Sequence, residues 1–481
     1  MNEYSQAAFE KILAEYNREH AWLLSLITDP EGKRYFVEKS AGERLREYQE
    51  QLARMADFLK FAGNPQEKFS SIHVAGTSGK GSVTVMLASM LQAAGIRTGH
   101  HTSPYLQVCN EKLVADGSMV SPSDFTETLI AFRQIYQAWI EHGGAYDALK
   151  YGEAWVGLTY LWLARQEVAW AVVETGLGGR YDPTNVLPAQ AAVITNIDYD
   201  HVNSLGPSLR EIAYHKAGII KPGAVVVTGE RKPDIVEVFQ QEAAEKNAVL
   251  FRIGSEFNYY HEDHFSSGLL TVEAPFNTFK NIRLGMKGKF QPENAALSVA
   301  LLDIMAERQM IEINPGDAVK ELEHIRFPGR LEIIQQSPLV IMDGAHNPHK
   351  MQGLVDSMLD IYPGRKITVV FGMLSTKDAE GMLQQLSRLS PDWMLTQPHV
   401  FGKPSLQAEE IAETVGKKYI GTKVNVFENV SDAVEAAIGA SGPDDIVLIT
   451  GSLYLLGEAR ERWYPKDEIL RALEYGPNPI S

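Results

Sequence analysis

The sequence has a single cysteine, Cys109, in 481 residues, and it has no long apolar run. One cysteine cannot form an internal disulfide, which is typical of proteins from reducing compartments. No stretch approaches the roughly 20 apolar residues that a membrane-spanning helix needs. The first segment, MNEYSQAAFEKILAEYNREH, is charged throughout and lacks the apolar core of a secretory signal. We therefore expect a cytoplasmic protein that does not associate with membranes.

Basic residues are too few for a general nucleic-acid-binding protein. The chain has 45 lysines and arginines against 61 aspartates and glutamates, a formal net charge of −16. A protein that binds nucleic acid needs a surface that neutralises phosphates. Small anionic ligands are not excluded, because a pocket can be basic inside an acidic protein. Hydrophobic residues at 44% and charged residues at 22% are typical of a soluble globular enzyme.

Apolar periodicity predicts an α/β protein. Residues 1–60 have apolar positions at helical spacing. The strand SIHVA, a glycine-rich turn and the helix KGSVTVMLASMLQAAG follow, and strand and helix patterns then alternate, which indicates a parallel sheet flanked by helices. Residues 251–288 alternate apolar and polar positions between turn residues and predict a small β-rich excursion. The helical pattern PENAALSVALLDIMAE comes after it.

A second alternating series begins after RFPGR at 326–330. Its predicted strands are PLVIMD, KITVVFG, WMLTQP, KVNVFE and DIVLITG, each separated by a segment of helix length. A chain of this length favours two domains. We place the boundary near 326–330, within about four residues, so that an N-terminal domain at 1–326 is followed by a smaller Rossmann-like domain at 327–481.

The segment HVAGTSGKGSV at 73–83 is similar to a Walker A loop but differs in spacing. In the usual pattern the lysine directly precedes Ser or Thr, whereas here Gly81 separates Lys80 from Ser82. The loop glycines let the backbone approach an anion, and the following helix contributes its N-terminal amides. Lys80 can bind β- and γ-phosphates, and the Ser82 hydroxyl can ligate Mg²⁺. A plain glycine turn is disfavoured by the strand-loop-helix context.

A metal–ATP site needs more ligands than one serine supplies. Three candidates follow predicted strands: Ser103 in HTSPYL, Glu174 in AVVETGLGG and His201 in DYDHVNSLG. In α/β sheets, ligands bind outside the carboxyl ends of the strands. Each residue taken singly is more typical of a surface or packing position. Their recurrence at separate strand ends indicates a metal site.

Eight motifs together resemble one family. TSGKGS, TSPYL, ETGLGGRYDPTN, DYDHVNSLG, IAYHKAGI, QPENAAL, FPGRLE and DGAHNP stand in the order of the signatures of folylpolyglutamate synthase and dihydrofolate synthase, a branch of the Mur ligase family. The resemblance covers residues 50–460 and implies a two-domain Mur-ligase-like architecture that begins with a P-loop-type, ATP-binding domain. It also implies an ATP-dependent ligase. The carboxylate of a folate becomes an acyl phosphate, and the amine of L-glutamate then attacks it, releasing phosphate.

The resemblance assigns nucleotide and metal ligands by motif. The residues it assigns to ATP are Gly76, Thr77, Gly79, Lys80, Gly81, Ser82, Asn294 at the adenine, Arg330 at a phosphate and Asp343 at the ribose. The residues it assigns to one or two Mg²⁺ ions are Ser82, Ser103, Glu174 and His201. Lys216 resembles a family lysine that is carbamylated, which would make it an anionic metal ligand. The alternative is an unmodified lysine that contacts phosphate.

The same resemblance implies a catalytic set and a substrate contact. Lys80, Lys216 and His346 are the expected catalytic residues, and Asp182 is the expected pterin contact. The expected partners are small molecules: a reduced folate or folate precursor, L-glutamate and ATP. We expect a monomer that binds no nucleic acid.

Four segments differ from the family pattern. Ser78 replaces the usual Asn, His215 replaces the usual acid, and ALKYGEAW has Lys150 near the expected acid. The stretch KRYFVEKSAGERLREYQEQLARM has no clear match to the loop that holds dihydropteroate in bifunctional members. We therefore favour a reduced folate as acceptor over a dihydropteroate-only activity. A Mur-type ligase for another pterin-like or cell-wall-type carboxylate is the alternative. An ATP-dependent switch or binding module is the alternative from another class.

Three other features are interpreted as structural. Trp155 and Trp162 lie seven residues apart on one predicted helix, which is typical of core packing. Cys109 has no neighbouring motif that would make it a nucleophile. His100 and His101 point to opposite sides of a predicted strand, so we do not expect them to bind one metal ion.

Overall fold

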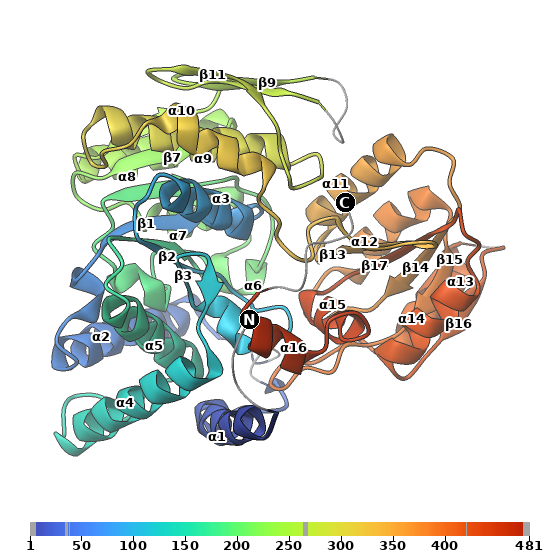
Figure 1. The fold of residues 1–481 in the computed structure, drawn as a ribbon, viewed down its shortest axis with the longest axis horizontal. Coiled ribbons are helices and arrows are strands. Elements are labelled where there is room, and N and C mark those ends of the chain that lie inside the picture. Colours follow the sequence, from blue (N-terminus) through green and yellow to red (C-terminus); the bar gives the residue numbers. More distant parts are fainter. Residues whose placement is uncertain (1–5, 34–36, 38, 263–267, 420, 475–481) are drawn as a thin grey trace.

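In the computed structural model, which describes residues 6–33, 37, 39–262, 268–419 and 421–474, two α/β units lie side by side (Figure 1). The first unit contains an eight-stranded sheet in the order β4-β3-β2-β5-β1-β6-β7-β8. Its strands are β1 Ser70–Ala75, β2 Thr98–His101, β3 Val114–Ala115, β4 Ser118–Met119, β5 Trp170–Glu174, β6 Ala191–Ile194, β7 Val225–Thr228 and β8 Val249–Arg252. Six of these strands run parallel, and β3 and β4 form an antiparallel edge.

The central strands of this sheet are apolar because helices cover both of its faces. In β1 every residue after Ser70 is buried, as is all of β5 and β6. The parallel register places Val74 beside Glu174 and Ala75 beside Ile194. The loops that follow these three strands therefore start at the same edge of the sheet.

The helices of the first unit confirm the predicted pattern. They are α1 Gln6–Ser25, α2 Ala41–Phe61, α3 Lys80–Ala93, α4 Pro122–Glu141, α5 Tyr151–Arg165, α6 Val202–Leu205, α7 Leu209–Ala217, α8 Pro233–Glu245, α9 Gln291–Glu307 and α10 Pro315–Ala318. Short 3₁₀ helices are η2 Pro65–Glu67, η3 Cys109–Lys112, η4 Pro183–Val186 and η5 Val319–Glu323. At the start of α4, the Asp124 amide donates to the Ser121 hydroxyl over 3.0 Å, a side-chain N-cap.

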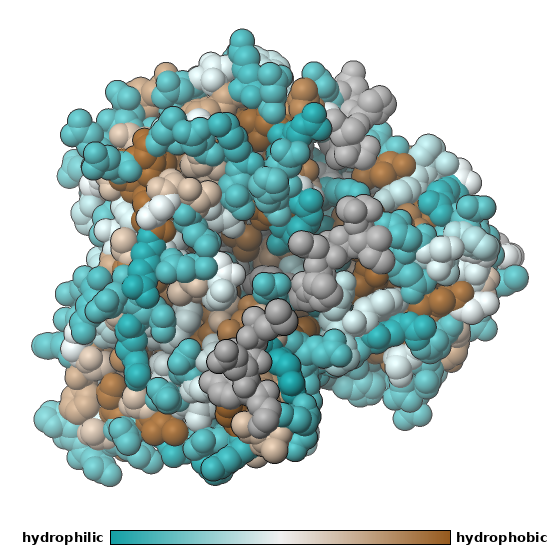
Figure 2. All heavy atoms as spheres, viewed as in Figure 1, coloured by the Kyte–Doolittle hydropathy of each residue, from teal (hydrophilic) through white to brown (hydrophobic). Residues whose placement is uncertain are grey.

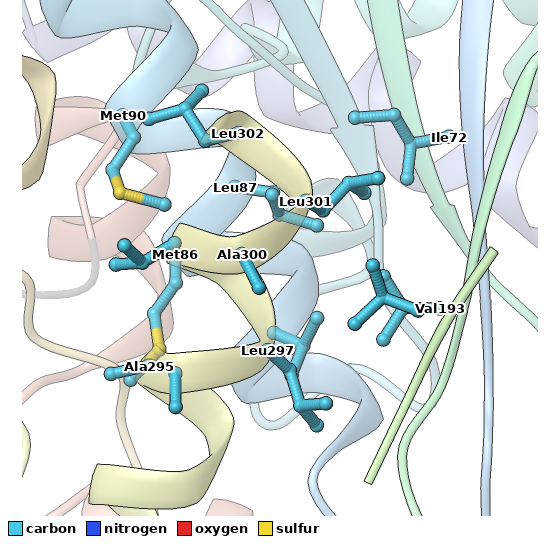
Figure 3. Packing of buried hydrophobic residues seen from close by; sticks show 14 of the residues in the cluster. Ile72, Met86, Leu87, Met90, Val193, Ala295, Leu297, Ala300, Leu301 and Leu302 are labelled. Atoms are coloured by element: carbon cyan, nitrogen blue, oxygen red, sulfur yellow. The ribbon is translucent and has the colours of Figure 1, made fainter. Parts of the chain in front are cut away.

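Each face of the sheet has its own apolar core. On one face α3 and α9 pack together, and Figure 3 shows Leu87 and Leu301 from these helices beside Ile72 of β1. On the other face α1, α2, α4 and α5 form a second cluster that contains Trp155 and Trp162, 1% and 3% exposed. The interpretation of the two tryptophans as core residues is confirmed.

The predicted β-rich excursion is a three-stranded antiparallel sheet in the order β11-β10-β9. Its strands are β9 Asn258–His261, β10 Leu270–Glu273 and β11 Thr278–Ile282. Leu270 and Val272 are fully buried in the same cluster as α3 and α9. This small sheet therefore extends the core over the outer side of α9 (Figure 1).

The second unit has a six-stranded sheet in the order β12-β13-β17-β14-β15-β16. Its strands are β12 Glu332–Gln336, β13 Leu339–Asp343, β14 Ile367–Phe371, β15 Asp392–Leu395, β16 Val424–Val426 and β17 Ile446–Thr450. The helices are α11 Pro348–Ile361, α12 Ala379–Leu386, α13 Ala408–Lys418, α14 Val430–Gly439, α15 Leu453–Arg460 and α16 Lys466–Ala472, with the 3₁₀ helix η6 Ser387–Leu389. All five predicted strands are confirmed. The antiparallel edge strand β12 was not expected.

Residues 324–331 connect the two units, between η5 and β12. We propose these residues, which contain the 326–330 segment, as the boundary between domains at 1–326 and 327–481. The last helix nevertheless returns to the first unit. Ile469 and Leu470 of α16 are buried in the cluster that contains Phe9 of α1, and Arg471 lies 4.3 Å from the centre of the Phe9 ring.

The visible surface is largely hydrophilic, with apolar residues in small separate groups (Figure 2). Within the described ranges, no helix combines the length and apolarity that crossing a bilayer requires.

The core between α3 and α9 gives a stability prediction. Leu87 is fully buried, so Leu87→Ala leaves a cavity and should cost about 2–5 kcal/mol of unfolding free energy. The matched control is Leu359→Ala, because Leu359 is 42% exposed and its loss should cost less than about 0.5 kcal/mol. Urea denaturation of both variants checks this. Equal midpoints for the two would contradict the packing described.

Candidate active site

The glycine loop between β1 and α3 has a backbone that only glycine allows. Gly76 and Gly79 have φ values of 146° and 83°. A Cβ at Gly76 would lie 1.7 Å from Thr195 Oγ1, and one at Gly79 would lie 2.3 Å from Asn294 Oδ1. Gly79 is the N-cap of α3, and no side chain of the described residues caps this helix. The first amides of α3 therefore remain available for an anion.

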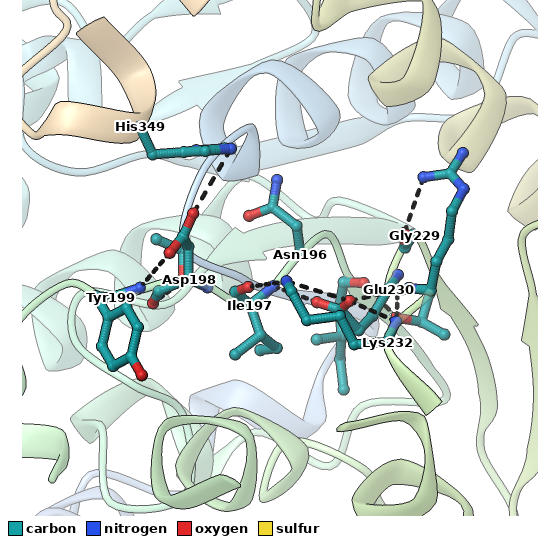
Figure 4. A network of polar contacts seen from close by, with 12 residues as sticks. Asn196, Ile197, Asp198, Tyr199, Gly229, Glu230, Lys232 and His349 are labelled. Atoms are coloured by element: carbon teal, nitrogen blue, oxygen red, sulfur yellow. Dashed lines mark hydrogen bonds and ion pairs between the residues drawn. The ribbon is translucent and has the colours of Figure 1, made fainter. Parts of the chain in front are cut away.

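The neighbouring strand end fixes this loop. The Thr77 and Ser78 amides donate to the backbone oxygen and to Oδ1 of Asn196 over 2.9 and 3.0 Å, and the Thr77 hydroxyl donates to the Asp198 carbonyl over 3.1 Å. In Figure 4 the segment 196–199 is joined in turn to Glu230, whose carboxylate accepts from the Ile197 amide. Thr77 thus has a structural role in the loop, and its contact with ATP stays a prediction.

Two lysines converge on one carbonyl of the loop. Lys80 and Lys216 donate to the Gly76 carbonyl over 3.3 and 2.7 Å. Lys80 also lies 3.8 Å from the Glu174 carboxylate. Lys216, at the end of α7, is buried, and this burial, together with the charge of Lys80, lowers its pKa well below the ordinary value. The neutral form of the Lys216 amine is therefore populated at a lower pH than that of a surface lysine.

Two of the predicted metal ligands, Glu174 and Ser103, lie together beside this loop. The Glu174 carboxylate, at the end of β5, accepts from the Ser103 amide over 3.1 Å. Burial raises the pKa of Glu174, while Lys80 opposes that rise. His201 is the N-cap residue of α6, and although its side chain is 46% exposed, partial burial and the charge of Lys377 lower its pKa to about 3. Its ring is therefore neutral at physiological pH and can act as a ligand.

The donor set fits Mg²⁺ bound together with a nucleotide. Among the residues that the structure describes, no group of three or more His, Cys, Asp or Glu side chains could hold a metal ion alone. Mg²⁺ usually takes one or two carboxylates and completes its shell with phosphates and water. Glu174 supplies a carboxylate, and a Cβ on Gly81, next to Ser82, would lie only 3.4 Å from Glu174 Oε2. The site is thus suited to metal–ATP rather than to a permanent metal.

The second unit reaches the same place through contacts that the sequence did not indicate. Lys377 Nζ lies 2.7 Å from Asp200 Oδ1, and the Asn347 side-chain amide donates to Asp200 Oδ2 over 3.3 Å. His349 lies 3.6 Å from the Asp198 carboxylate, as Figure 4 shows. Burial acts to raise the pKa of the Asp200 carboxyl, but the neighbouring His201, Lys377 and Lys350 hold it well below its usual range. Asp200 belongs to the DYDHVN motif, but neither it nor Lys377 was a candidate.

The second-unit candidates occupy adjacent turns. The Asp343 carboxylate, at the end of β13, accepts from the Leu331 and Ala345 amides over 3.0 and 2.9 Å, which fixes the turn after Arg330. Burial raises the pKa values of Asp343 and Glu174, and the charge of Arg330 opposes this rise at both carboxyls. Arg330 therefore lies within electrostatic reach of first-unit and second-unit carboxylates. The contacts of Arg330 with a phosphate and of Asp343 with the ribose stay predictions.

His346 is held between a carbonyl and a lysine. Its Nδ1 lies 2.8 Å from the Gly344 carbonyl, and its Nε2 lies 3.0 Å from Lys350 Nζ. Burial and the charge of Lys350 lower the pKa of His346 well below its usual value. The imidazole is therefore neutral.

Asp182, the predicted pterin contact, is buried and serves its own loop. Its carboxylate accepts from the Leu177 amide over 2.6 Å and from the Thr184 amide over 3.0 Å. A contact with a pterin stays a prediction.

His215, which stands where the family usually has an acid, lies against Tyr48 and Tyr181. Burial lowers its pKa to about 4, so it adds no charge beside Lys216.

The segment ALKYGEAW forms the start of α5. Lys150 precedes this helix, and its amide donates to the Glu153 carboxylate over 2.7 Å. Glu153 is buried and lies 2.5 Å from Arg54 of α2. The acid in this segment therefore joins two helices.

Cys109 and the two strand histidines are buried in the first unit. The Cys109 sulfur lies 3.0 Å from the Tyr16 hydroxyl, and burial raises the pKa of the thiol to about 12. His101 Nδ1 lies 3.1 Å from the Lys112 carbonyl. Both histidines lie in β2, where consecutive side chains point to opposite faces. These contacts support the structural interpretation of all three residues.

Comparison with known proteins gives consistent results over most of the chain. The family model of the Mur ligase middle domain matches residues 74–302, and that of the Mur ligase glutamate ligase domain matches residues 329–453. The dihydrofolate synthase/folylpolyglutamate synthase of Bacillus subtilis is 31% identical over 420 residues, which cover 85% of this chain and 94% of that protein.

Solved structures agree with this. Folylpolyglutamate synthase of Mycobacterium tuberculosis complexed with ADP superposes with a TM-score of 0.82 at 27% identity, covering 94% of this chain and 99% of that chain. FolC of E. coli in complex with DHPP and ADP gives a TM-score of 0.78 at 28% identity and covers 92% of this chain and 97% of that chain.

The raised thiol pKa predicts an unreactive cysteine. Only the thiolate reacts with a disulfide reagent, and a pKa of about 12 with full burial leaves almost none at pH 8. In native protein we expect Ellman's reagent to release far less than one equivalent of thiolate in an hour. In 6 M guanidinium, about one equivalent should react within minutes because the exposed thiol regains a pKa of about 8.5. Rapid reaction of the native protein would contradict the burial.

Proposed function

The chain belongs to the dihydrofolate synthase/folylpolyglutamate synthase branch of the Mur ligases, and from that premise we propose a reduced folate as its acceptor and the cluster around the glycine loop as its active site. The protein is an ATP-dependent ligase that joins L-glutamate to a folate. The observation that carries the proposed site is a pair of ion pairs, Lys80 with Glu174 in the first unit and Asp200 with Lys377 of the second unit; Lys80 and Asp200 both act on the charge of the buried Lys216.

The chemistry explains why such a site is basic. A carboxylate is a poor electrophile until one of its oxygens becomes part of a leaving group. In the proposed sequence a carboxylate oxygen of the folate attacks the γ-phosphorus, and the bond to the β,γ-bridging oxygen breaks to release ADP. The glutamate amine then attacks the acyl carbon, phosphate leaves, and the amine loses a proton. The first step joins two anions, so fixed cations such as Lys80 and Arg330 favour it.

We propose the binding roles that the family motifs imply. Gly76, Thr77, Gly79, Lys80, Gly81 and Ser82 would hold the phosphates, Asn294 the adenine and Asp343 the ribose. The contact of Asn294 with Gly79 supports a nucleotide that lies across this end of α9. Ser82, Ser103, Glu174 and His201 would hold one or two Mg²⁺ ions. Bound Mg²⁺ would neutralise phosphate charge and polarise the transferring group.

Lys216 is proposed as a carbamate. A neutral amine adds to CO₂, forming a nitrogen–carbon bond and releasing one proton, and its lowered pKa favours the neutral form. The product is an anionic oxygen donor among Lys80, His201 and the proposed metal ligands. Without the modification, Lys80 and Lys216 share the Gly76 carbonyl and repel each other. With the carbamate, this repulsion is replaced by attraction, because Lys80 gains a second negative partner.

Asp182, His346 and the second unit have proposed roles in substrate binding and in excluding water. Asp182 would contact the pterin, and His346 would act near the phosphates or the incoming glutamate. Closure of the second unit over the site would keep water from the acyl phosphate. We propose a cytoplasmic monomer whose partners are the reduced folate, L-glutamate and ATP.

Substrate dependence of ATP turnover tests the proposed function. Wild-type protein with Mg²⁺ and ATP should release ADP at a steady rate only when a pterin acceptor and L-glutamate are both present, and tetrahydrofolate should be the fastest acceptor. Dihydropteroate should support a slower rate, because a reduced folate is the proposed acceptor. Turnover that is equally fast with neither substrate would indicate an ATP-dependent switch. Turnover with another pterin-like or cell-wall-type carboxylate, but with no folate, would indicate a different Mur-type ligase.

Carbamylation of Lys216 can be observed directly. Protein equilibrated with ¹³C-bicarbonate near pH 8 should give one slowly exchanging carbamate carbonyl signal by ¹³C NMR. The signal should be lost in Lys216→Arg, because arginine forms no carbamate. The exposed lysine variant Lys232→Arg is the control and should keep the signal. Absence of the wild-type signal would leave Lys216 as an unmodified phosphate contact.

A further inference from the structure

The first turn of α11 is anchored against the first unit. The Lys350 amide donates to the Asn347 side chain over 2.9 Å, which caps the helix. Asn347 is buried, and its side-chain amide also donates to Asp200 Oδ2 over 3.3 Å. Asn347 at the helix start and Lys350 three positions later are therefore held in place relative to the loop that follows β6. This anchoring places the Lys350 side chain at the meeting of the two units.

The Lys350 amine has an unusual partner. It lies 3.0 Å from His346 Nε2, and His346 Nδ1 lies 2.8 Å from the Gly344 carbonyl. A carbonyl can only accept, so Nδ1 carries the ring proton and Nε2 accepts from Lys350. His346 is neutral, so this bond orients the amine without compensating its charge.

The neighbouring lysines have carboxylate partners. Lys80 faces Glu174 at 3.8 Å and Lys377 faces Asp200 at 2.7 Å. Within the described part of the chain, no carboxylate lies within the 4 Å of an ion pair with Lys350. Half-buried cations are normally paired, so Lys350 is suited to an anion supplied by a substrate.

The surrounding charges indicate which anion. After burial, the largest influence on the Lys350 pKa is repulsion from Lys80, the lysine of the glycine loop. Lys377 and Arg330 also repel it, while Asp200 attracts it, and the combined effect lowers the pKa to about 7. The charge of Lys350, together with burial, lowers the pKa of His346, and it partly opposes the rise that burial causes in the pKa values of Glu174 and Asp343. Its environment is thus that of the phosphate end of the nucleotide.

We propose that Lys350 is a catalytic residue that binds the γ-phosphoryl group of ATP from the second unit, while Lys80 binds it from the first. This inference depends on the proposed function. As the folate oxygen attacks the γ-phosphorus and ADP leaves, Lys350 donates hydrogen bonds to non-bridging oxygens of the transferred group. It gains and loses no proton in that step. His346 is its positioning residue, because the imidazole fixes the direction of the amine.

Differential nucleotide binding tests the proposal without requiring turnover. Isothermal titration calorimetry with Mg²⁺ would compare ADP with AMPPCP, which has a γ-phosphoryl group but cannot transfer it. Lys350→Gln should weaken AMPPCP by at least about tenfold, as expected for loss of a hydrogen bond between charged groups. ADP should bind within about twofold of wild type. Lys350→Arg keeps the charge and should recover part of the AMPPCP affinity.

Lys417→Gln is the matched control. Lys417 belongs to the same unit, is 75% exposed on its side chain and carries the same charge change. Its affinities for both nucleotides should equal those of wild type. Thermal midpoints establish that each variant is folded, and Lys350→Met, which keeps much of the length, replaces Lys350→Gln if that variant is unstable. Weakening of ADP and AMPPCP by the same factor would overturn the proposal. So would a change confined to the KM for glutamate.

Proton uptake gives a second readout. A pKa of about 7 rises when the amine meets an anion, so AMPPCP binding at pH 8 should take up a proton at Lys350. Titrations in buffers of different ionisation enthalpy measure this uptake. It should decrease by most of one proton in Lys350→Gln and be unchanged in Lys417→Gln. Equal uptake in wild type and Lys350→Gln would overturn the assignment. If instead wild type binds AMPPCP normally but ADP release needs no folate, the proposed function fails and the binding results still stand.

Discussion

Repulsion among basic side chains is the constraint on which the active site depends. Five of them, from both units, contribute to the repulsion at Lys216 and Lys350: Lys80, Lys216, Arg330, Lys350 and Lys377. Glu174 and Asp200 compensate part of this charge at 3.8 and 2.7 Å. Such a concentration is unfavourable in the absence of anions, and it can persist only where rigid elements hold the groups in place. The fixed loop after β1 and the capped start of α11 are these elements.

The sequence predicted what depends on local order along the chain. The glycine loop, strand β1 and the parallel strands of the second sheet follow from periodicity and backbone requirements that act over a few positions. The loop lysine and the candidate ligands at strand ends could be proposed in the same way, because parallel strands bring their carboxyl ends together. Glu174 illustrates this: its place at the end of β5 suffices to bring it to Lys80.

Contacts between distant segments could not be predicted from one sequence. Asp200 and Lys377 are separated by 177 positions, and their pairing depends on how the units meet. The edge strand β12 is defined by its partner β13 rather than by its own pattern. Asp182 and Asp343 show a further limit: motifs mark them for ligands, yet their carboxylates fix local turns. A motif alone does not distinguish a residue that contacts a ligand from one that fixes a turn by hydrogen bonds, because a turn that positions ligand-binding groups also needs residues that fix it.

The return of α16 to α1 changes how the second unit can move. The polypeptide crosses between the units at 324–331 and crosses back at 461–465, so residues 332–460 are joined to the first unit covalently at one end and through the packing of α16 against α1 at the other. A body attached at two points keeps little freedom except rotation about the line that joins them. Domain closure in this enzyme should therefore be a rotation about the axis through the two connections. Cleavage of either connection would remove this restriction on the relative motion of the units.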